Sequence, residues 1–312
     1  MTDRDSRDIR VAVIILTVNQ RDKTLACLDS LMPGLPDYAR VLVWDNGSSD
    51  ATAESVRERY PGVVVEAHPH NLGVASGRNS GARLAISLFA PTHLLFLDND
   101  MLLAEGFVEG LLGPFRADVS GRVGQTQAKL RFMNEPERLN DGGGCRIRFW
   151  LGTTSPVGYR EIDHGQYDTI KPCISCGGAM LVRTDLFEQL GGFDTLFDPF
   201  GPEDLDFSLR LQQAGYQALY APQAVAYHEV SHTTGSDGYS EGYAEHRSRH
   251  WLTFLSRHAT LRQKAAFYCV GVPYIAMRIL VREGSKGNWG ALKGLLKGVS
   301  RKVFAGRVHR GG

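Results

Sequence analysis

Two acidic clusters, far apart in this sequence of 312 residues, carry side chains that could do chemistry. The first is Asp98-Asn99-Asp100, which comes directly after the strand-like run His93–Leu97. Two carboxylates one residue apart at a strand end can reach the same cation, and Mg²⁺ and Mn²⁺ prefer oxygen ligands while they bind substrate phosphates. The triplet therefore predicts a divalent metal site, although a polar loop that closes a strand would produce the same three residues.

The second cluster, Glu203, Asp204 and Asp206, stands at the start of a predicted helix. Pro202 precedes it, and proline suits the first turn of a helix because it has no backbone N–H to leave unpaired. Acidic residues in a first turn also complement the helix dipole, which is the plain structural explanation. Three acids in four residues exceed what that role needs, and their mutual repulsion would raise one pKa toward that of a useful base. We therefore predict a general base here.

Segments that alternate between strand and helix patterns position the first cluster. Strands are predicted at Val11–Leu16, Val41–Trp44, Val63–Glu66 and Leu94–Leu97, with helices at about 25–32, 50–59 and 75–89 between them. This alternation predicts an α/β fold with a Rossmann-like, doubly wound, mostly parallel sheet. Ligands bind beyond the carboxyl ends of the strands in such sheets, and Asn19, Asp45 and Asp98 all follow predicted strand ends.

The pattern loosens between residues 115 and 170, where glycine, aspartate, arginine and aromatic residues mix without clear periodicity. We predict loops and short strands there that shape a pocket. Order returns over 178–227, with a strand at Ala179–Val182, helices at Thr184–Leu190 and Glu203–Ala214, and a strand at Ala224–Tyr227. The second acidic cluster is thus expected in a second half of the same domain.

Short motifs follow one another along the chain: Thr17-Val18-Asn19, Asp45-Asn46-Gly47-Ser48-Ser49-Asp50, Asn71-Leu72-Gly73, Gly77-Arg78-Asn79, Asp98-Asn99-Asp100, Gly177-Gly178-Ala179, Gly191-Gly192-Phe193-Asp194, Glu203-Asp204-Leu205-Asp206 and His228. In this order they resemble family 2 glycosyltransferases with the GT-A fold. The nearest branch is that of the bacterial rhamnosyltransferase-like enzymes of cell-surface polysaccharide assembly. The resemblance covers roughly residues 10–235.

The resemblance implies a donor site in the first half of the chain. It places contacts to the nucleotide sugar at Thr17, Asn19, Asp45, Arg78, Asp98 and Asn99, with Asp45 at the nucleotide base. It places a divalent cation, Mg²⁺ or Mn²⁺, at Asp98, Asp100 and His228. The implied donor is a nucleoside diphosphate sugar, linked to UDP or dTDP, and the implied acceptor is a glycan or a lipid-linked glycan.

The resemblance also implies an inverting reaction. Asp204, with Glu203 beside it, matches the general base that removes the acceptor hydroxyl proton as that oxygen attacks C1 of the sugar. The metal neutralises charge that builds on the departing nucleotide diphosphate. A single displacement then inverts the anomeric centre.

Two positions leave the recognition of base and phosphate open. Family members often carry an aromatic residue where this chain has Val18, and a valine side chain cannot stack on a base. Arg78 lies in a segment rich in glycine and asparagine. Its guanidinium would either face the diphosphate or pair with an acid to brace the site.

The net charge of +1 conceals two regions of opposite sign. Residues 261–312 carry eleven Lys and Arg and the single acid Glu283, for a net charge of +10, whereas the other 260 residues carry a net charge of −9. Such a basic block predicts a surface for anionic partners, either lipid headgroups or nucleic acid. The block lacks interleaved surface aromatics and the main domain is acidic, so we expect no nucleic-acid binding.

We expect a catalytic domain at 1–250, with a donor half at about 10–115 and an acceptor half at about 116–250, and a helical C-terminal extension at 251–312. In the extension, Ala265–Met277 is apolar but too short to span a bilayer alone. One face of a later predicted helix carries Leu292, Leu295, Leu296, Val299 and Val303, beside Lys293, Lys297 and Arg301. Such a helix suits an anionic membrane surface, with packing on the catalytic domain or in a homodimer as the alternative.

Composition favours the cytoplasm, and we expect peripheral association with the inner face of the cell membrane. The five cysteines are odd in number and mostly isolated, which suits a reducing compartment. Residues 1–10 are polar and charged and show no apolar stretch of a secretion signal.

Two further motifs suggest other chemistry. His228-Glu229-Val230-Ser231-His232 matches the H-E-x-x-H pattern of zinc proteases, but that chemistry needs a helix and these residues favour a strand or loop. Cys173 and Cys176 resemble half of a zinc site or a redox pair, yet no second such pair follows. A non-catalytic protein that binds nucleotide sugars is a further alternative.

Overall fold

The computed structural model describes residues 9–175, 177–229, 240–284, 289–290 and 292–299. The chain forms two compact units. The sheet unit comprises residues 1–145, 156–198 and 203–230, and the helical unit comprises residues 146–155, 199–202 and 231–312. The domain boundary expected at residue 250 thus falls inside the helical unit, which also includes a β-hairpin from the middle of the chain.

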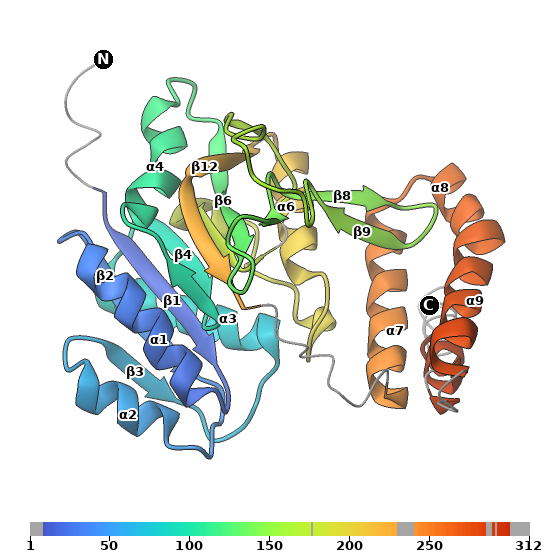
Figure 1. Ribbon diagram of the computed structural model, residues 1–312, viewed down its shortest axis with the longest axis horizontal. Helices are drawn as coiled ribbons and strands as arrows, with labels where there is room; N and C mark the ends of the chain where they lie inside the picture. The colour runs from blue at the N-terminus through green and yellow to red at the C-terminus, as the bar shows by residue number, and fades with distance from the viewer. Residues whose placement is uncertain (1–8, 176, 230–239, 285–288, 291, 300–312) are drawn as a thin grey trace. The chain divides into compact units, whose positions relative to one another are not determined.

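Four parallel strands form the first half of the sheet unit, in the order β4-β1-β2-β3 (Figure 1). They are β1 (Val11–Thr17), β2 (Ala39–Asp45), β3 (Val64–Ala67) and β4 (His93–Asp98). The helices between them are α1 (Arg21–Leu31), the short η1 (Met32–Gly34), α2 (Thr52–Arg59) and α3 (Val74–Phe89). Parallel strands need such crossovers, and the prediction of strands alternating with helices is confirmed here.

Strand β1 is buried on both faces, which explains its unbroken apolar run. Val11, Val13 and Ile15 pack in one core cluster with side chains of α1, whereas Ala12 and Ile14 pack in another with side chains of α3. Helix α3 comes close to the strand at Gly81, where a Cβ atom would lie 2.9 Å from Ile14 Cγ2. The sheet therefore has helices on both faces, as a doubly wound fold requires.

The second half of the sheet is mixed rather than parallel. Its strands are β5 (Met101–Leu103), β6 (Val123–Phe132), β7 (Leu139–Asp141), β10 (Lys171–Pro172), β11 (Ala179–Arg183) and β12 (Gln217–His228). Strand β11 runs antiparallel to β4 and β6, while β12 runs parallel to β6 and antiparallel to β5 and β10. The expectation of a mostly parallel sheet thus holds for the first four strands, and the second half departs from it.

Strand β6 lies in the segment for which we predicted only loops and short strands, and that part of the prediction was wrong. The strand is ten residues long and nine of its residues are buried. Gln125, Gln127 and Lys129 are among them, and each is at most 2% exposed. Because these polar side chains occupy core positions, the strand lacks the apolar run that marked β1.

Helices α4 (Phe107–Ala117), α5 (Thr184–Gln189) and α6 (Glu203–Gln213), with the short η2 (Thr195–Phe197), complete the sheet unit. Leu111 and Leu112 of α4 join the core cluster that contains α1. Phe187 of α5 and Phe207 of α6 join the cluster that contains α3. The acidic start of α6 is therefore carried on the same face of the sheet as Arg78.

The helical unit consists of α7 (Glu241–His258), α8 (Leu261–Ala266), a π-helical segment η3 (Phe267–Gly271), α9 (Val272–Gly284) and a helical stretch over 292–299. Strands β8 (Cys145–Arg148) and β9 (Thr153–Pro156) form the hairpin, of which residues 146–155 belong to this unit. Phe149 of the hairpin stacks on Phe254 of α7, with ring centroids 5.9 Å apart. Leu252, Leu255, Ala259 and Phe267 form its small core.

Leu261–Val281 is a single helical segment of 21 residues that is long and apolar enough to cross a membrane, with a mean hydropathy of 1.4 over its most apolar window. The sequence prediction ended the apolar run at 13 residues because Arg278 follows it, and the run contains Gly271 and Pro273. The π-helical turn before Pro273 lets the helix continue through these two residues. A proline removes one backbone donor and needs extra room in the preceding turn, and the wider π-helical turn provides that room. Length alone thus does not exclude a membrane span here.

Candidate active site

The loops after β1 and β2 form the donor end of the predicted site. Asp45, at the end of β2, is buried, and its Oδ1 accepts the backbone N–H of Ser48 at 2.8 Å. Asn19 follows β1, donates its backbone N–H to Ser48 Oγ at 2.9 Å and accepts the backbone N–H of Ser49 at 2.8 Å. The two loops are therefore tied to each other, with Asn19 as the brace between them.

Thr17 and Asn99 lie together but point into the protein. Asn99 is 9% exposed, and its Nδ2 donates to Thr17 Oγ1 and to Thr24 Oγ1, each at 3.1 Å. Thr17 Oγ1 also lies 2.8 Å from Thr24 Oγ1. These bonds anchor the middle residue of the acidic triplet to α1, so the two carboxylates on either side of it have a fixed backbone.

Arg78 joins the two acidic clusters. Its guanidinium is buried and donates to Asp98 Oδ1 at 2.5 Å and to Glu203 Oε1 at 3.1 Å. It also lies over the ring of Phe193, 5.8 Å from the centroid. Burial by itself would lower the pKa of Arg78, but the charges of Asp98 and Glu203 raise it. The sequence left two roles open for Arg78, contact with the diphosphate or an ion pair that braces the site. The contacts in the structure are ion pairs with two acids, as in the second role.

Asp100 faces His228 across the end of the sheet. Strand β12 pairs with β5 so that His228 stands opposite Met101, and the backbone N–H of Glu229 donates to the Asp100 carbonyl at 2.9 Å. His228 Nε2 lies 3.5 Å from Asp100 Oδ1, and Nδ1 lies 3.1 Å from Asn140 Oδ1. Burial lowers the pKa of His228, but the bond to Asp100 outweighs it, and the net shift is upward.

Asp100 and His228 have the donor atoms that a divalent cation needs, an oxygen and an imidazole nitrogen at adjacent positions. Asp98, the third predicted ligand, is held by Arg78 instead. Within the described ranges, no three His, Cys, Asp or Glu side chains gather as a metal cluster. Because Mg²⁺ and Mn²⁺ complete their coordination with water and substrate phosphates, the pair Asp100 and His228 still fits such an ion.

The helix α6 begins with Glu203, which is buried, and Asp204, which is partly exposed. Burial, and then the charge of Asp204, raise the pKa of Glu203 to about 8. Burial also raises the pKa of Asp204 to about 6, although Arg78 opposes this shift. Asp206, the third acid, forms an ion pair with Arg210 at 2.7 Å and is fully buried. Asp206 therefore braces its own helix, and Asp204 is the acid of the pair that ionises first.

Gly177 and Gly178 lie between the two clusters. The carbonyl of Gly178 accepts the backbone N–H of Asp98 at 2.7 Å. Gly177 has a φ of +79°, and a Cβ atom there would lie 2.4 Å from Asp204 Oδ2. The main chain thus passes directly against the Asp204 carboxylate, which only a glycine allows.

Several positioning residues escaped the sequence analysis. Asp198 accepts the backbone N–H groups of Ala75 at 2.9 Å and Ser76 at 3.2 Å, and so caps the start of α3, the helix of Arg78. Asn79 exchanges two hydrogen bonds with the backbone of Phe193, at 2.7 and 2.9 Å. A sequence signal existed only for Asn79 and Phe193, since both lie in the quoted motifs.

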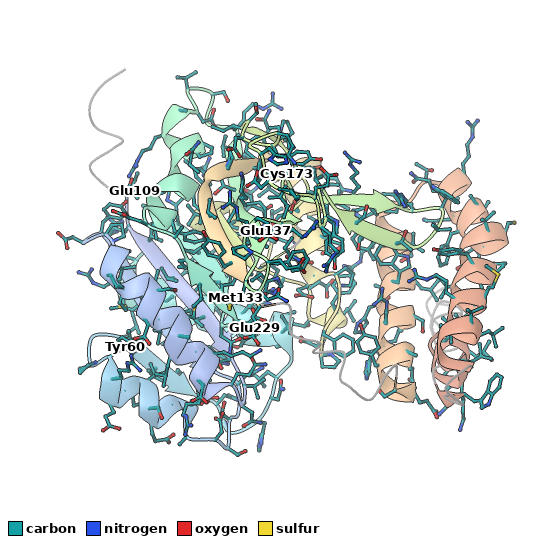
Figure 2. All side chains as sticks on the ribbon, in the orientation of Figure 1. Tyr60, Glu109, Met133, Glu137, Cys173 and Glu229 are labelled. Carbon is teal, nitrogen blue, oxygen red and sulfur yellow. The ribbon has the colours of Figure 1, made fainter. Side chains whose placement is uncertain are left out.

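The two alternative motifs are only partly described. His228 ends β12 rather than lying in a helix, and Glu229, labelled in Figure 2, forms an ion pair with Lys23 at 3.3 Å. His232 and Cys176 lie outside the described residues. Cys173 is buried beside Tyr220, and burial raises the pKa of its thiol, so it lacks the thiolate character of a redox centre.

The fold and these clusters together define a glycosyltransferase of the GT-A type. The model of the family described as glycosyl transferase family 2 matches residues 12–191, and a model described as the N-terminal domain of galactosyltransferase matches residues 165–233. The chain therefore belongs to glycosyl transferase family 2, and the predicted rhamnosyltransferase-like resemblance is supported by a curated relative that is named a rhamnosyltransferase.

Two curated relatives come from Mycobacterium tuberculosis (strain ATCC 25618 / H37Rv). An N-acetylglucosaminyl-diphospho-decaprenol L-rhamnosyltransferase is 27% identical over 239 residues, which cover 70% of this chain and 75% of that protein. A pre-mycofactocin glycosyltransferase is 26% identical over 221 residues, which cover 70% of this chain and 43% of that protein.

Two solved structures share the fold at low sequence identity. GalNAc-T7 with UDP, GalNAc and Mn²⁺ has a TM-score of 0.64 and 17% identity; the match covers 93% of this chain and 54% of that one, so this chain spans about half of it. The mannosyltransferase PcManGT from Pyrobaculum calidifontis with GDP-Man and Mn²⁺ has a TM-score of 0.52 and 18% identity, over 95% and 87% of the two chains. These similarities confirm the predicted GT-A fold.

Proposed function

We propose that this glycosyltransferase transfers a sugar, with inversion, from a nucleoside diphosphate donor to a hydroxyl group of a lipid-linked glycan, and that a divalent cation assists it. The observation that carries this proposal is the arrangement around Gly177 and Gly178, where Asp98 lies on one side and Asp204 on the other. A donor-binding acid and a base therefore flank one short piece of main chain.

The donor would bind at the ends of β1, β2 and β4, with its nucleotide base toward Asp45 and its diphosphate toward Asp98 and Asp100. Both solved neighbours hold Mn²⁺ with a nucleotide or nucleotide sugar, which supports a divalent cation here. Asp100 and His228 would hold the ion, which supplies positive charge for the leaving diphosphate. Asn19 and Asn99 would act as positioning residues, because their side chains hold the loops rather than the opening of the site.

Asp204 would act as the base. As the acceptor oxygen forms a bond to C1, its proton passes to the Asp204 carboxylate, and the bond from C1 to the diphosphate oxygen breaks with its electrons. Asp204 suits this task better than Glu203, because its pKa of about 6 leaves it ionised at neutral pH. Glu203, with a pKa near 8, retains its proton longer and keeps its contact to Arg78.

The acceptor class rests on the curated relative whose name specifies a diphospho-decaprenol rhamnosyltransferase. Four further points remain predictions from the sequence. They are the choice of UDP or dTDP over GDP, the cytoplasmic location, peripheral membrane contact through the C-terminal residues, and a homodimer. The basic block at 261–312 and the exposed apolar side chains of α8 and α9 support the membrane contact.

Donor turnover tests the proposal directly. The protein should release nucleoside diphosphate from at least one of a panel of UDP-, dTDP- and GDP-sugars with Mn²⁺ or Mg²⁺, and EDTA should abolish it. Asp100→Ala should weaken metal-dependent donor binding. The anomeric proton coupling of the transferred sugar, measured by NMR, should show inversion. Retention of configuration, or full turnover in EDTA, would contradict the proposal.

A further inference from the structure

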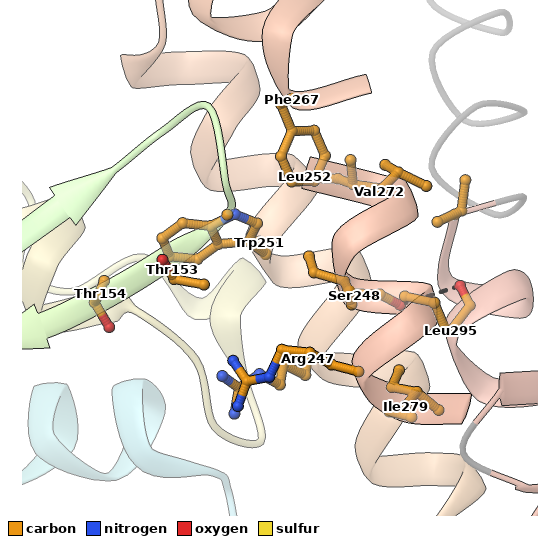
Figure 3. Close-up of a pocket in the computed structure, with 15 residues that line it drawn as sticks. Thr153, Thr154, Arg247, Ser248, Trp251, Leu252, Phe267, Val272, Ile279 and Leu295 are labelled. Atoms are coloured by element: carbon orange, nitrogen blue, oxygen red, sulfur yellow. Dashed lines mark hydrogen bonds between the residues drawn. The ribbon is translucent and has the colours of Figure 1, made fainter. Parts of the chain in front are cut away.

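The helical unit contains a cavity of about 140 Å³ that the site of the sheet unit does not use. Its lining includes Leu252 of α7, Phe267 of η3, Ile275 and Ile279 of α9, and Leu295 and Val299 of the last helical stretch (Figure 3). Leu252 and Phe267 are buried. The buried part of the lining is thus mainly apolar, with Ser248 as its polar member.

The last helical stretch lines the cavity with Leu295 and Val299, whereas Leu296 on the same stretch is 62% exposed. A Cβ atom at Gly298 would lie 1.9 Å from Ser248 Oγ, so the stretch packs closely on α7. Lys293 lies 3.6 Å from a carboxylate oxygen of Glu241, and Lys297 also pairs with Glu241. Residues 292–299 of the predicted amphipathic helix thus pack on α7 within the helical unit, and Arg301 and Val303 lie outside the described residues; contact with a membrane, with the catalytic domain or with a second copy stays a prediction.

The mouth of the cavity is positively charged. Arg247 and Arg278 are lining residues, and both are exposed, whereas no described lining residue is acidic. Arg247 donates to the Tyr243 hydroxyl at 3.2 Å, and Arg278 lies over the Tyr274 ring, 5.6 Å from its centroid. A ligand with an anionic head and an apolar body would match both parts of this cavity.

The outer side of the same helices is apolar and exposed. Leu261 is 84% exposed, Met277 is 56% exposed and Val281 is 70% exposed. Only 11% of the most apolar window of Leu261–Val281 is buried. Because Ile275 and Ile279 of α9 face the cavity, one helix separates the cavity from this apolar surface. A long hydrocarbon chain could thus leave the cavity and continue on apolar side chains.

We propose that the cavity binds the first isoprene units of a phosphate-linked prenyl lipid, with the phosphate at Arg247 and Arg278. The ligand class rests on the proposed function, since this lipid would be the carrier of the acceptor glycan. The cavity resembles in size a protein cavity of about 150 Å³ that accepts benzene, so it suits a compact, methyl-branched unit. The rest of the chain would lie along the exposed side of α8 and α9, in the membrane.

Calorimetry with the full chain and farnesyl phosphate tests this inference. The lipid is kept below the concentration at which it forms micelles. Farnesyl phosphate should bind at least about 10-fold more tightly than inorganic phosphate, because the apolar chain adds burial. Dodecyl phosphate has the same main-chain length without methyl branches and should bind more weakly than farnesyl phosphate. Equal binding of the two chains would overturn the choice of an isoprenoid.

Ile275→Trp should fill the cavity and remove the advantage of farnesyl phosphate over inorganic phosphate. Met277→Trp is the matched control, because it places the same side chain two residues further on the exposed side of α9. If Ile275→Trp lowers the unfolding temperature, Leu295→Trp fills the cavity from another helix. Unchanged binding in a folded cavity variant would overturn the inference.

The transfer reaction separates this inference from the proposed function. In the folded cavity variant, KM for a prenyl-linked acceptor should rise about 10-fold. KM for the same sugar on a short water-soluble aglycone should stay unchanged, and so should the rate of donor hydrolysis. If the wild-type protein hydrolyses none of the donors, the proposed function is refuted. An equal change in KM for both acceptors would refute the cavity as a lipid site.

Discussion

In the sheet unit, several charged side chains are buried and form ion pairs, whereas in the helical unit several large apolar side chains are exposed to solvent. Arg78 is buried between Asp98 and Glu203, and Lys129 is buried against Asp163 and Asp168. Leu261 and Val281, by contrast, are mostly exposed. Burying charge costs free energy unless partners compensate for it, and exposing apolar surface also costs free energy in water. The first arrangement suits the charged donor that we propose for this site, and the second suits the lipid contact that we propose for the helical unit.

The largest effect is expected at the base. Asp204→Asn should lower the transfer rate about 1000-fold, because the carboxamide cannot accept the acceptor proton, while donor affinity changes by less than about 2-fold. Stopped assays of transfer and calorimetry of donor binding measure the two quantities. Glu203→Gln is the comparison, because it keeps the polar contact to Arg78, and it should cost less. A larger loss in Glu203→Gln than in Asp204→Asn would reverse the assignment of the base.

Arg78→Met should lower the free energy of unfolding by about 3 kcal/mol, because it leaves buried acids without their shared partner. Urea unfolding measures this change. Arg83→Met is the matched control on the same helix, since Arg83 is exposed and donates only to Ser80 Oγ among the bonds described. Equal destabilisation by the two variants would mean that the bridge between the acidic clusters contributes little to stability.

Activity and stability should respond to pH in opposite directions. Transfer should fall about 10-fold per pH unit below pH 6, because the base must be ionised and the pKa of Asp204 is raised to about 6. Stability has the opposite sign: a carboxyl group whose pKa is raised by folding binds its proton more tightly in the folded state. The stabilising contribution of Glu203 and Asp204 to the free energy of unfolding is thus present at low pH and is lost as the pH rises toward 8. Thermal unfolding of Glu203→Gln should show a weaker decline over this range, and an identical decline would contradict the account.

The smallest effect concerns the exposed helix surface. Val281→Asp should lower binding to vesicles with anionic lipids about 5-fold, because an apolar contact is replaced by a charge that the headgroups repel. Vesicle flotation measures it. Val119→Asp, at a position in the sheet unit that is 79% exposed, is the control and should leave flotation unchanged. If neither the wild-type protein nor any variant floats, the exposed apolar face serves some contact other than a membrane.

How far the sequence predicted the molecule depended on where polar residues lie. The apolar runs of β1, β2 and β4 gave the parallel half of the sheet, and the acids at their ends marked the site. Strand β6 escaped because Gln125, Gln127 and Lys129 occupy its core positions. Strand β12 is twelve residues long, but only Ala224–Tyr227 was predicted, since Gln217 and Gln223 interrupt its first part.

The candidate site shows the same limit at the level of single side chains. The motifs placed Asp98, Asp100, Asp204 and His228 in one region, and the structure brings Asp100 to His228 and Asp98 to Arg78. The partners Asn140 and Asp198 carried no sequence signal, because their roles depend on loops that meet only in the folded chain. Arg78 had two possible roles until its neighbours were known.

The glycine at position 177 has a consequence for how an acceptor could approach Asp204. Its backbone covers one side of the Asp204 carboxylate, at a distance that no other residue permits. An acceptor hydroxyl must then reach this carboxylate from another side. The approach of the acceptor hydroxyl would thus depend on a residue with no side chain, and Gly177→Ala would raise KM for the acceptor before it weakened donor binding.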